Sequence, residues 1–558
     1  MVLFLVCVPV SGAQTQLFSA QLASPVAVYS HSAATAGSVA QPVNETQALH
    51  EVDQLQRLKK AGMHFDYDLI DAAAFAPDGA YRTFRAAAWP NGPDAWIGKC
   101  LATRIRPGLR FGGNTLTAMQ SAPAWTNSLT HDGHRLSLFE GGYLPDLVAA
   151  MQTWYDRGIR LFAFDSFDLS AATPAAAAKL TGDQIALRNA AALREAFASF
   201  HARNRDAVLM IAVEPGNHPD LARLAATGVF TFVSTGAPRP SAVPEASPWR
   251  SVDIESDQAV RRFEQTGVPL AQIDSPGPFA GGNAGSDMGP WKGAFLLSMA
   301  RGGWLNTIHG DLALLQDADA RWSARAQKLF LNLQQTGSMH SFGGSPGGSQ
   351  PYGFAGASAH GSVYVVVNPG QSIASLALPT CHAYKLSKDG RVQFRDAGFE
   401  PRLSGNSVTL GPGQMAVVGF GAFASSAFNF GVQQDVVIPH SIEPVDADFE
   451  STDSGALEAS LDPPIEGVVR VVVRPRDAGS ALANPKGTQP FTLEAMQYGR
   501  PIPVRLDSGS GSQWVVGEID VNDLTPGVPL KVTLEANSST QTSLQASAYA
   551  VESYAVEY

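Results

Sequence analysis

Cysteine, positive charge and cofactor motifs are all scarce in this chain of 558 residues. Its three cysteines, Cys7, Cys100 and Cys381, lie too far apart for a metal-ligand spacing or a disulfide framework. Acidic residues outnumber basic ones, 50 to 39, and the net charge of -11 argues against a nucleic acid or an anionic membrane surface as partner. The sequence therefore predicts no metal, no cofactor and no nucleic-acid partner.

Long apolar runs are also missing beyond the first residues, so no membrane span is expected. Met1–Gly12 is almost wholly apolar, and Ser11-Gly12-Ala13 offers small residues for cleavage. We expect residues 1–13 to be a signal peptide and the protein to be secreted or periplasmic. A buried N-terminal strand is the alternative interpretation.

The rest of the chain changes character at three points. Residues 14–49 are rich in Ala, Ser, Val and Gln without helical or strand period, which predicts a linker or arm. Residues 50–345 alternate between strand-like and helix-like stretches. Residues 346–428 and 429–558 contain short alternating strands with Gly, Pro and Ser at the turns, which predicts an antiparallel β-sandwich and a separate accessory sandwich that could bind carbohydrate.

Eight strand-like stretches over about 270 residues have the rhythm of a (β/α)8 TIM barrel, an α/β fold. A doubly wound open sheet is the alternative, but no Gly-rich phosphate fingerprint follows the first strand. The predicted strands are Phe65–Asp71, Ile105–Phe111, Arg135–Phe139, Arg160–Asp165, Val208–Glu214, Val229–Ser234, Leu270–Asp274 and Gly303–His309.

Polar side chains stand at the C-terminal ends of nearly all of these strands. In a barrel those ends surround one pocket, which is where the active site lies. The residues are Asp71, Asn114, Glu140, Asp165, Glu214, Ser234, Asp274 and His309, interleaved with aromatic residues that include Trp89 and Trp249. Carboxylates among aromatic faces, without a metal set, are what sugar hydrolysis requires, so we expect a carbohydrate substrate.

Gly158–Asp168 is the centre of this pattern, because its apolar strand ends in two carboxylates. Tyr155–Asp165 resembles the "G-x-x-x-x-K-x-D" segment of melibiase-type α-galactosidases, whose aspartate is the nucleophile. Asp71, Trp89–Gly92 and Ile105–Phe111 are similar to the opening of the same family. Pro248–Asp253 resembles, with one extra residue, its "W-x-S-D" segment, which carries the acid/base. The chain is thus identified as a divergent member over about residues 50–425.

This resemblance implies a retaining glycoside hydrolase that cleaves a terminal α-linked sugar, galactose or a related one. It makes Asp165 the nucleophile and Asp253 the acid/base, while Asp274 is the reserve candidate for the acid/base. The remaining positions are expected to bind the substrate: Asp71, Trp89, Asn114, Glu140, Glu214, Trp249, Asp274 and His309.

The chain departs from the family at sugar-binding positions. Ala72-Ala73-Ala74 replaces a second aspartate and a tryptophan, and Ala163 stands where the family has a lysine. The alternative function is therefore a catalytically weak carbohydrate-binding relative with the same fold. A structural surface protein is a second alternative, but crowding carboxylates at strand ends would not benefit such a protein. The oligomeric state has no signal in the sequence.

Overall fold

The structure is a computed structural model of the whole chain. It describes residues 22, 24–31, 43–77, 80–116, 123–213, 219–234, 248–280, 288–336, 339–348, 350–370, 372–379, 389–396, 399–411, 413–433, 439–452, 454–464, 467–475, 491–507, 515–536 and 544–553. No helix within these ranges is long and apolar enough to cross a membrane.

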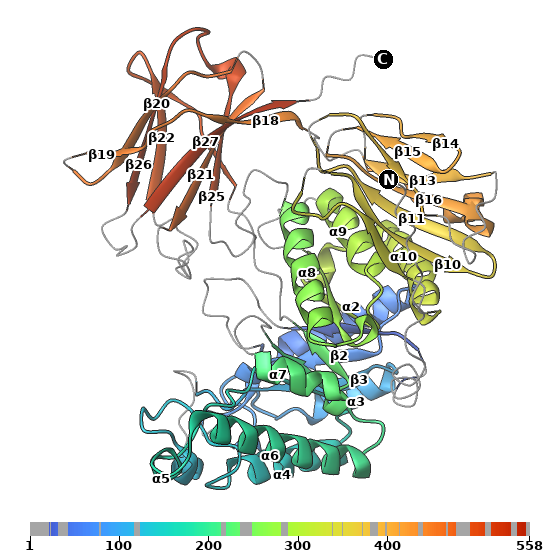
Figure 1. Cartoon of the computed structure of the whole chain (residues 1–558), viewed down its shortest axis with the longest axis vertical. Helices are drawn as coiled ribbons and strands as arrows, with labels where there is room; N and C mark the ends of the chain where they lie inside the picture. Colours follow the sequence, from blue (N-terminus) through green and yellow to red (C-terminus); the bar gives the residue numbers. More distant parts are fainter. Residues whose placement is uncertain are drawn as a thin grey trace.

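Eight parallel strands form a barrel in the order β6-β5-β4-β3-β2-β1-β8-β7. An isolated parallel bridge between Val233 and Ile273 joins the two ends of this order, so the sheet closes on itself. The predicted (β/α)8 fold is confirmed (Figure 1). The strands are β1 (Val26–Ser30), β2 (Tyr67–Ile70), β3 (Arg106–Phe111), β4 (Leu161–Phe164), β5 (Val208–Ala212), β6 (Phe232–Ser234), β7 (Asp274–Ala280) and β8 (Leu305–Gly310).

A helix follows each strand and covers the outside of the barrel. Local sequence sets their ends: Thr181 and Gln184 form a reciprocal capping box at the start of α6, and the side chain of Asn44 caps α2. The helices are α2 (Glu45–Lys60), α3 (Asp94–Ala102), α4 (Tyr143–Asp156), α5 (Pro174–Ala177), α6 (Gly182–Arg203), α7 (Pro219–Leu224), α8 (Pro248–Gln265), α9 (Met288–Ala300) and α10 (Asp317–Gln335).

Two predictions about the barrel were wrong. Val26–Ser30, within the expected linker, is strand β1 and lies between β2 and β8. Arg135–Phe139, expected to be a strand, lies in the connection between β3 and α4 and makes isolated bridges there. Leu136 and Leu138 in this segment pack into the core outside the sheet. The sequence therefore alternates between apolar and polar residues, as a strand would, although the segment does not join the sheet.

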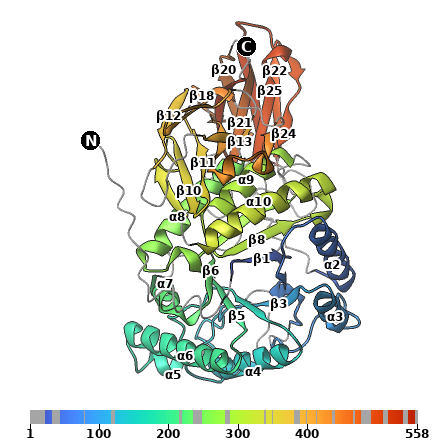
Figure 2. The same ribbon diagram turned by 90° about the vertical axis from the view of Figure 1, so that its right-hand side faces the viewer.

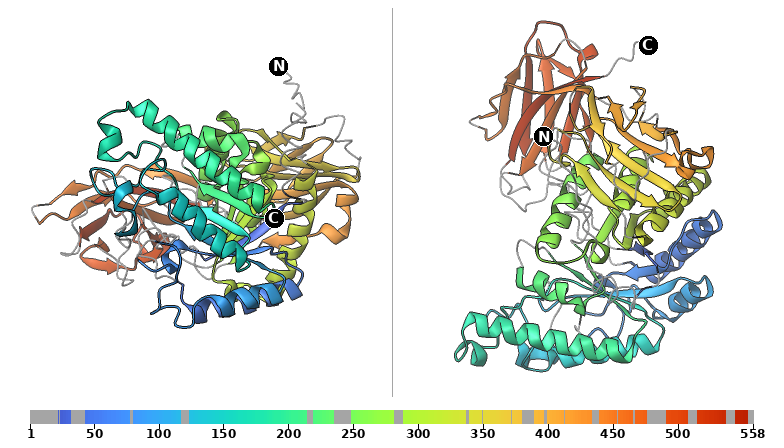
Figure 3. Two further views of the ribbon diagram at one scale, coloured as in Figure 1. Left: turned by 90° about the horizontal axis from the view of Figure 1, so that it is seen from below. Right: turned by 45° about the vertical axis from the view of Figure 1, so that its right-hand side comes forward.

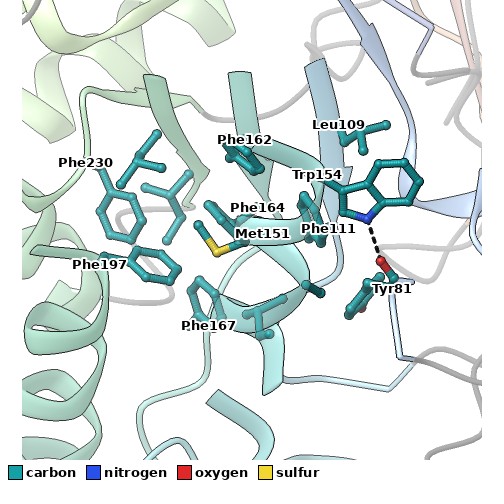
Figure 4. Packing of buried hydrophobic residues seen from close by; sticks show 14 of the residues in the cluster. Tyr81, Leu109, Phe111, Met151, Trp154, Phe162, Phe164, Phe167, Phe197 and Phe230 are labelled. Atoms are coloured by element: carbon teal, nitrogen blue, oxygen red, sulfur yellow. Dashed lines mark hydrogen bonds between the residues drawn. The ribbon is translucent and has the colours of Figure 1, made fainter. Parts of the chain in front are cut away.

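The aromatic core outside β3 and β4 fixes the direction of their side chains. Phe111, Phe162 and Phe164 point outward and pack among residues of α4 and α6 such as Trp154 and Phe197 (Figure 4). Successive strand residues face opposite sides of the sheet. The residues that alternate with these phenylalanines therefore face the inside of the barrel.

The first β-sandwich shares its core with the barrel helices. Trp322 of α10 packs against Phe394 and Phe430, and its indole donates a hydrogen bond to the Phe430 carbonyl at 2.8 Å. Figure 2 shows α8, α9 and α10 between the barrel strands and this sandwich. Its two sheets have the orders β17-β13-β16-β11-β10-β9 and β12-β15-β14. The strands are β9 (His340–Gly343), β10 (Tyr352–Ser358), β11 (Gly361–Val367), β12 (Ala374–Ala377), β13 (Arg391–Asp396), β14 (Arg402–Ser404), β15 (Ser407–Leu410), β16 (Met415–Gly421) and β17 (Gly431–Gln433).

The second β-sandwich has a core of its own. It consists of two five-stranded sheets, β18-β27-β21-β25-β24 and β19-β20-β26-β22-β23, drawn in orange and red in Figure 3. The sheets enclose a cluster of residues that all come from this part of the chain, such as Val471, Leu493 and Val532. The strands are β18 (Pro439–Val445), β19 (Glu450–Ser451), β20 (Leu457–Leu461), β21 (Val468–Pro475), β22 (Phe491–Gln497), β23 (Arg500–Ile502), β24 (Arg505–Asp507), β25 (Val515–Asp520), β26 (Leu530–Ala536) and β27 (Leu544–Ser553).

The separate cores predict different results for two truncations. A chain ending at Gln433 keeps every residue of the core shared by barrel and first sandwich, so we expect one cooperative thermal transition and soluble protein. A chain ending at Gly344 loses Tyr352, Phe394 and Phe430 and exposes the apolar face of α10, so it should aggregate. Calorimetry and size-exclusion chromatography of both chains test this. Aggregation of the longer chain would show that the second sandwich is part of the same folding unit.

Candidate active site

The inside of the barrel changes from apolar to polar toward the C-terminal ends of the strands. Its lower layers contain residues such as Val26, Leu161, Val208 and Leu305, which form one buried cluster. Following the two-residue period along each strand places a polar layer above them. That layer consists of Ser30, Asp71, Arg110, Asp165, Ser234, Asp274, Thr307 and His309. It is the candidate site, at the face where barrel enzymes carry their chemistry.

Arg110 on β3 lies between the two carboxylates that end the neighbouring strands. Its Nη1 is 3.5 Å from Asp165 Oδ1, and its Nε is 3.8 Å from Asp71 Oδ2. Asp71 also accepts a hydrogen bond from the Ala73 amide at 3.0 Å, which fixes its side chain at the start of a short 3-10 helix. The structure thus brings Asp71 and Asp165 together around one guanidinium.

Asp165 occupies a position from which it can react. About half of its side-chain surface is exposed (51 %), in contrast to 11 % for Arg110. The surrounding barrel wall removes hydration and raises the pKa of Asp165, the charge of Arg110 opposes this shift, and Asp71 adds to it. A carboxylate held beside a cation and open to the mouth can act as a nucleophile.

Asp274 lies deeper in the barrel and is 4 % exposed. Its two carboxylate oxygens accept hydrogen bonds of 2.8 Å from Ser234 and Thr307. Burial raises the pKa of Asp274 to about 6, against the two hydroxyl hydrogen bonds and the charge of Arg110, which lower it. This carboxyl group can therefore exchange a proton near neutral pH.

His309, two residues after Thr307 on β8, is 3 % exposed. Burial and the charge of Arg110 lower the pKa of His309 to about 4, so the imidazole is neutral at neutral pH. It can donate or accept a hydrogen bond but contributes no charge to the site.

Asp253 lies elsewhere, contrary to its predicted role as acid/base. It is on α8 and forms a buried ion pair with Arg301, which follows α9, and a hydrogen bond with Tyr352 of β10. The Asp253 and Arg301 side chains are 1 % and 3 % exposed. A carboxylate enclosed by an arginine and a tyrosine joins two helices to the first sandwich and does not reach the barrel mouth. Pro248–Asp253 forms the start of helix α8.

Two other predicted binding residues have structural roles. Trp89 is 2 % exposed, packs against Phe84 and Trp96, and donates a hydrogen bond to the Val43 carbonyl at 2.8 Å. The Asn114 side chain is fully buried, and its amide is committed to backbone groups of Leu136 and Asp168. Neither side chain is available to a sugar, so both predictions were wrong.

Glu140 is not brought into this layer. Glu140 lies in the connection before α4 and accepts a hydrogen bond of 2.5 Å from Thr173, the residue that caps α5. Glu214 lies outside the described residues, as does the side chain of Trp249, whose backbone is part of α8.

Sequence reasoning missed Arg110, Ser30 and Thr307. Arg110 had a detectable signal, because a charged residue near the end of an otherwise apolar strand is costly to bury without a partner. Ser30 was missed together with strand β1.

Within the described residues, no group of three or more His, Cys, Asp or Glu side chains is arranged to hold a metal ion.

An open groove of about 990 Å³ lies outside the barrel, between the end of α2 and α10. It is lined by Ala, Gly and basic side chains such as Arg321 and Lys328, without a carboxylate. It shares no residue with the polar layer, so it is not the candidate site.

The buried ion pair of Asp253 predicts a loss of stability when it is broken. Asp253→Ala leaves the Arg301 charge buried without its partner, which should lower the free energy of unfolding by about 3–5 kcal/mol. Asp220→Ala on α7 is the control, because Asp220 and its partner Arg223 are mostly exposed (62 % and 71 %) and the change should cost about 1 kcal/mol or less. Urea unfolding measures both. Loss of activity in Asp253→Asn at unchanged stability would contradict this structural role.

The raised pKa of Asp274 predicts a pH-dependent stability difference. Its pKa rises from 3.8 to about 6 on folding, so its contribution is fully present below about pH 4 and is lost as pH rises through 6. The stability of the native chain relative to Asp274→Asn should therefore fall by about 2 kcal/mol between pH 4 and 7. Urea unfolding at intervals of one pH unit measures this, with Asp523→Asn, an exposed aspartate, as control. A difference that does not change with pH would refute the assignment.

Comparisons with known proteins give similarity of fold only. No protein family and no curated protein matches the sequence. Similar solved structures include a GH36 α-galactosidase from Geobacillus stearothermophilus, at 11 % identity and a TM-score of 0.48, covering 71 % of this chain and 55 % of that one. A GH27 β-L-arabinopyranosidase from the same organism has 11 % identity and a TM-score of 0.48, covering 73 % and 98 %. A trehalulose synthase has 12 % identity and a TM-score of 0.47, covering 71 % and 98 %.

The chain thus spans about 55 % of the length of the GH36 enzyme, and its neighbours carry out different reactions. In fold, the chain is similar to glycoside hydrolases of GH36 and GH27, at low sequence identity.

Proposed function

We propose that this protein is a retaining glycoside hydrolase that binds a terminal sugar in the barrel mouth. The observation that carries the proposal is the arrangement of Asp71 and Asp165, which end neighbouring strands and lie on either side of Arg110. A sugar in the mouth would find an exposed carboxylate for attack and a second carboxylate for its hydroxyl groups. The motifs around Asp71 and Asp165 support an α-linked galactose or a related sugar as substrate.

Asp165 is the proposed nucleophile. Its carboxylate attacks the anomeric carbon, the glycosidic C–O bond breaks, and an acid supplies a proton to the leaving oxygen. Water then attacks the glycosyl ester, transfers its proton to the same group and releases Asp165. The charge of Arg110 favours the ionised form of Asp165 that the first step requires.

Asp274 replaces Asp253 as the proposed acid/base. With a pKa of about 6, a substantial fraction of Asp274 holds a proton in mildly acidic solution, whereas Asp253 is neutralised by Arg301. Ser234 and Thr307 hold its carboxyl group on the inner wall. The retaining mechanism requires the two carboxyl groups to lie about 5–5.5 Å apart when substrate is bound.

Export and carbohydrate binding by the second sandwich belong to the same proposal. The apolar residues 1–13 favour a secreted or periplasmic location, where polymeric and conjugated sugars are accessible. The second sandwich, with its separate core, could hold the protein on such a substrate.

A second candidate is a sugar-binding protein with little or no catalysis. Two observations favour it: the predicted acid/base is enclosed in an ion pair, and Ala163 faces the barrel interior where the family has a lysine. Measurements that separate binding from turnover distinguish the two candidates.

Asp165→Asn should lower turnover of 4-nitrophenyl glycosides by at least about 10³-fold and leave sugar binding largely intact, because the amide cannot act as the nucleophile. The panel begins with 4-nitrophenyl α-D-galactopyranoside. An activated 5-fluoroglycosyl fluoride should add one glycosyl mass to the native chain, located on Asp165 by peptide mass spectrometry.

Asp168→Asn is the matched control for this experiment, since Asp168 also follows β4 but is held by Arg135 and Ser170. It should keep most of the activity. If the native chain cleaves no glycoside and forms no adduct, but galactose binding is detected by calorimetry, the binding protein is the correct candidate.

A further inference from the structure

Arg110 is directly opposite Ala163 in the pairing of β3 with β4, on the inward face of both strands. The small side chain of Ala163 leaves room above it, and the guanidinium extends toward the ends of the neighbouring strands, where it meets Asp71 and Asp165. The cation of this site is therefore supplied by a strand different from the one that carries the proposed nucleophile.

The described residues use little of the hydrogen-bonding capacity of Arg110. Its Nε is buried and has no hydrogen-bond partner among the described residues. The 3.5 Å and 3.8 Å contacts are long compared with the 2.7–2.9 Å typical of charge-assisted hydrogen bonds, and a guanidinium has five N–H donors. Arg110 therefore retains donors for a ligand in the mouth.

The charges around Arg110 indicate which ligand fits. Asp71 on β2, Asp165 on β4 and Asp274 on β7 supply three carboxyl groups, whereas Arg110 is the cation that acts on Asp165 and Asp274. His309 on β8 is neutral. An excess of carboxyl groups opposes a sugar with a carboxylate, phosphate or sulfate. It suits neutral hydroxyl groups, which can donate to Asp71 and accept from Arg110 at the same time.

We propose that Arg110 is the positioning and specificity-determining residue of this site. It holds the carboxylates of Asp71 and Asp165 on either side of its guanidinium, and together with Asp71 it binds two adjacent hydroxyl groups of a neutral sugar. This inference rests on the proposed function for its substrate, but the positioning of Asp165 can be tested without any substrate.

The first test measures the reactivity of Asp165 toward a carbodiimide and glycine ethyl ester, which label protonated carboxyl groups. Arg110→Met removes the neighbouring cation, so labelling of Asp165 at pH 6 should rise severalfold, about tenfold for each unit by which its pKa increases. Arg110→Lys keeps the charge and should stay near the native rate. Labelling of Asp168, which is paired with Arg135, is the internal control.

Asp71→Asn provides an independent variant with the opposite sign, since it removes a negative neighbour and should slow the labelling of Asp165. Asparagine can still accept the hydrogen bond from the Ala73 amide, so this variant should fold even if Arg110→Met does not. Unchanged labelling of Asp165 in a folded Arg110→Met or Asp71→Asn protein would overturn the positioning role.

The second test concerns the sugar. On 4-nitrophenyl α-D-galactopyranoside, or the best substrate of the panel, Arg110→Met should lower kcat/KM by about 100-fold, the loss expected for a charged hydrogen bond in a buried site, and Arg110→Lys by less. The native chain should reject the corresponding uronide. On a deoxy substrate that lacks one of the two adjacent hydroxyl groups, Arg110→Met should lower kcat/KM only a few-fold.

An equal effect of Arg110→Met on the intact and the deoxy substrate, or efficient cleavage of the uronide, would overturn the specificity role. If no glycoside is cleaved, the proposed function fails by itself. Calorimetry with galactose and galacturonate then decides the specificity role, and preference for the uronate in the native chain would refute it.

Discussion

The two-residue alternation of strand β4 is the constraint on which the site depends. Phe162 and Phe164 are packed outward among the aromatic residues of α4 and α6, so Ala163 and Asp165 must face inward. A shift of one residue in the register of β4 would bury the Asp165 carboxylate in that aromatic core and place a phenylalanine in the barrel mouth. Such a shift would destabilise the fold by several kcal/mol. The same alternation on β3 turns Leu109 and Phe111 outward and Arg110 inward. Packing outside the sheet therefore sets the chemistry inside it.

A second set of contacts joins the barrel to the first sandwich and accounts for the location of Asp253. Helices α8 and α9 lie between the two units, and Asp253, Arg301 and Tyr352 each come from a different segment of the chain there. A buried ion pair is weak evidence for stability by itself, but it specifies how its segments are arranged, since a displaced partner leaves an unpaired charge. An aspartate that resembles an acid/base in sequence is used here to fix the sandwich on the barrel.

The sequence predicted the repeating architecture well because local patterns determine it. The (β/α)8 barrel, the sandwiches after it, and the places of Asp71 and Asp165 at strand ends follow from hydrophobic period and strand length. The role of Asp253 could not be predicted, since nothing within Pro248–Asp253 shows that a distant Arg301 and Tyr352 enclose its carboxylate. Asn114 and Trp89 failed for the same reason: their partners, Asp168 and Val43, are set by tertiary structure. Strand β1 was missed because it is only five residues long and lies within a segment rich in Ala, Ser, Val and Gln that has no strand period.

The position of β1 determines the order in which the barrel can assemble. This strand precedes the rest of the barrel in the sequence, yet it pairs with β8, and the Tyr29 hydroxyl donates to the Gly310 carbonyl across 281 residues. Strands β2 to β6 are neighbours both in sequence and in space, so they can associate while the ribosome is still adding the second half. Closure must wait until β8 has emerged, and until then the edge of β1 that pairs with β8 is free. The barrel therefore remains an open sheet until β8 has been synthesised, and the free edge of β1 can pair with another chain up to that point.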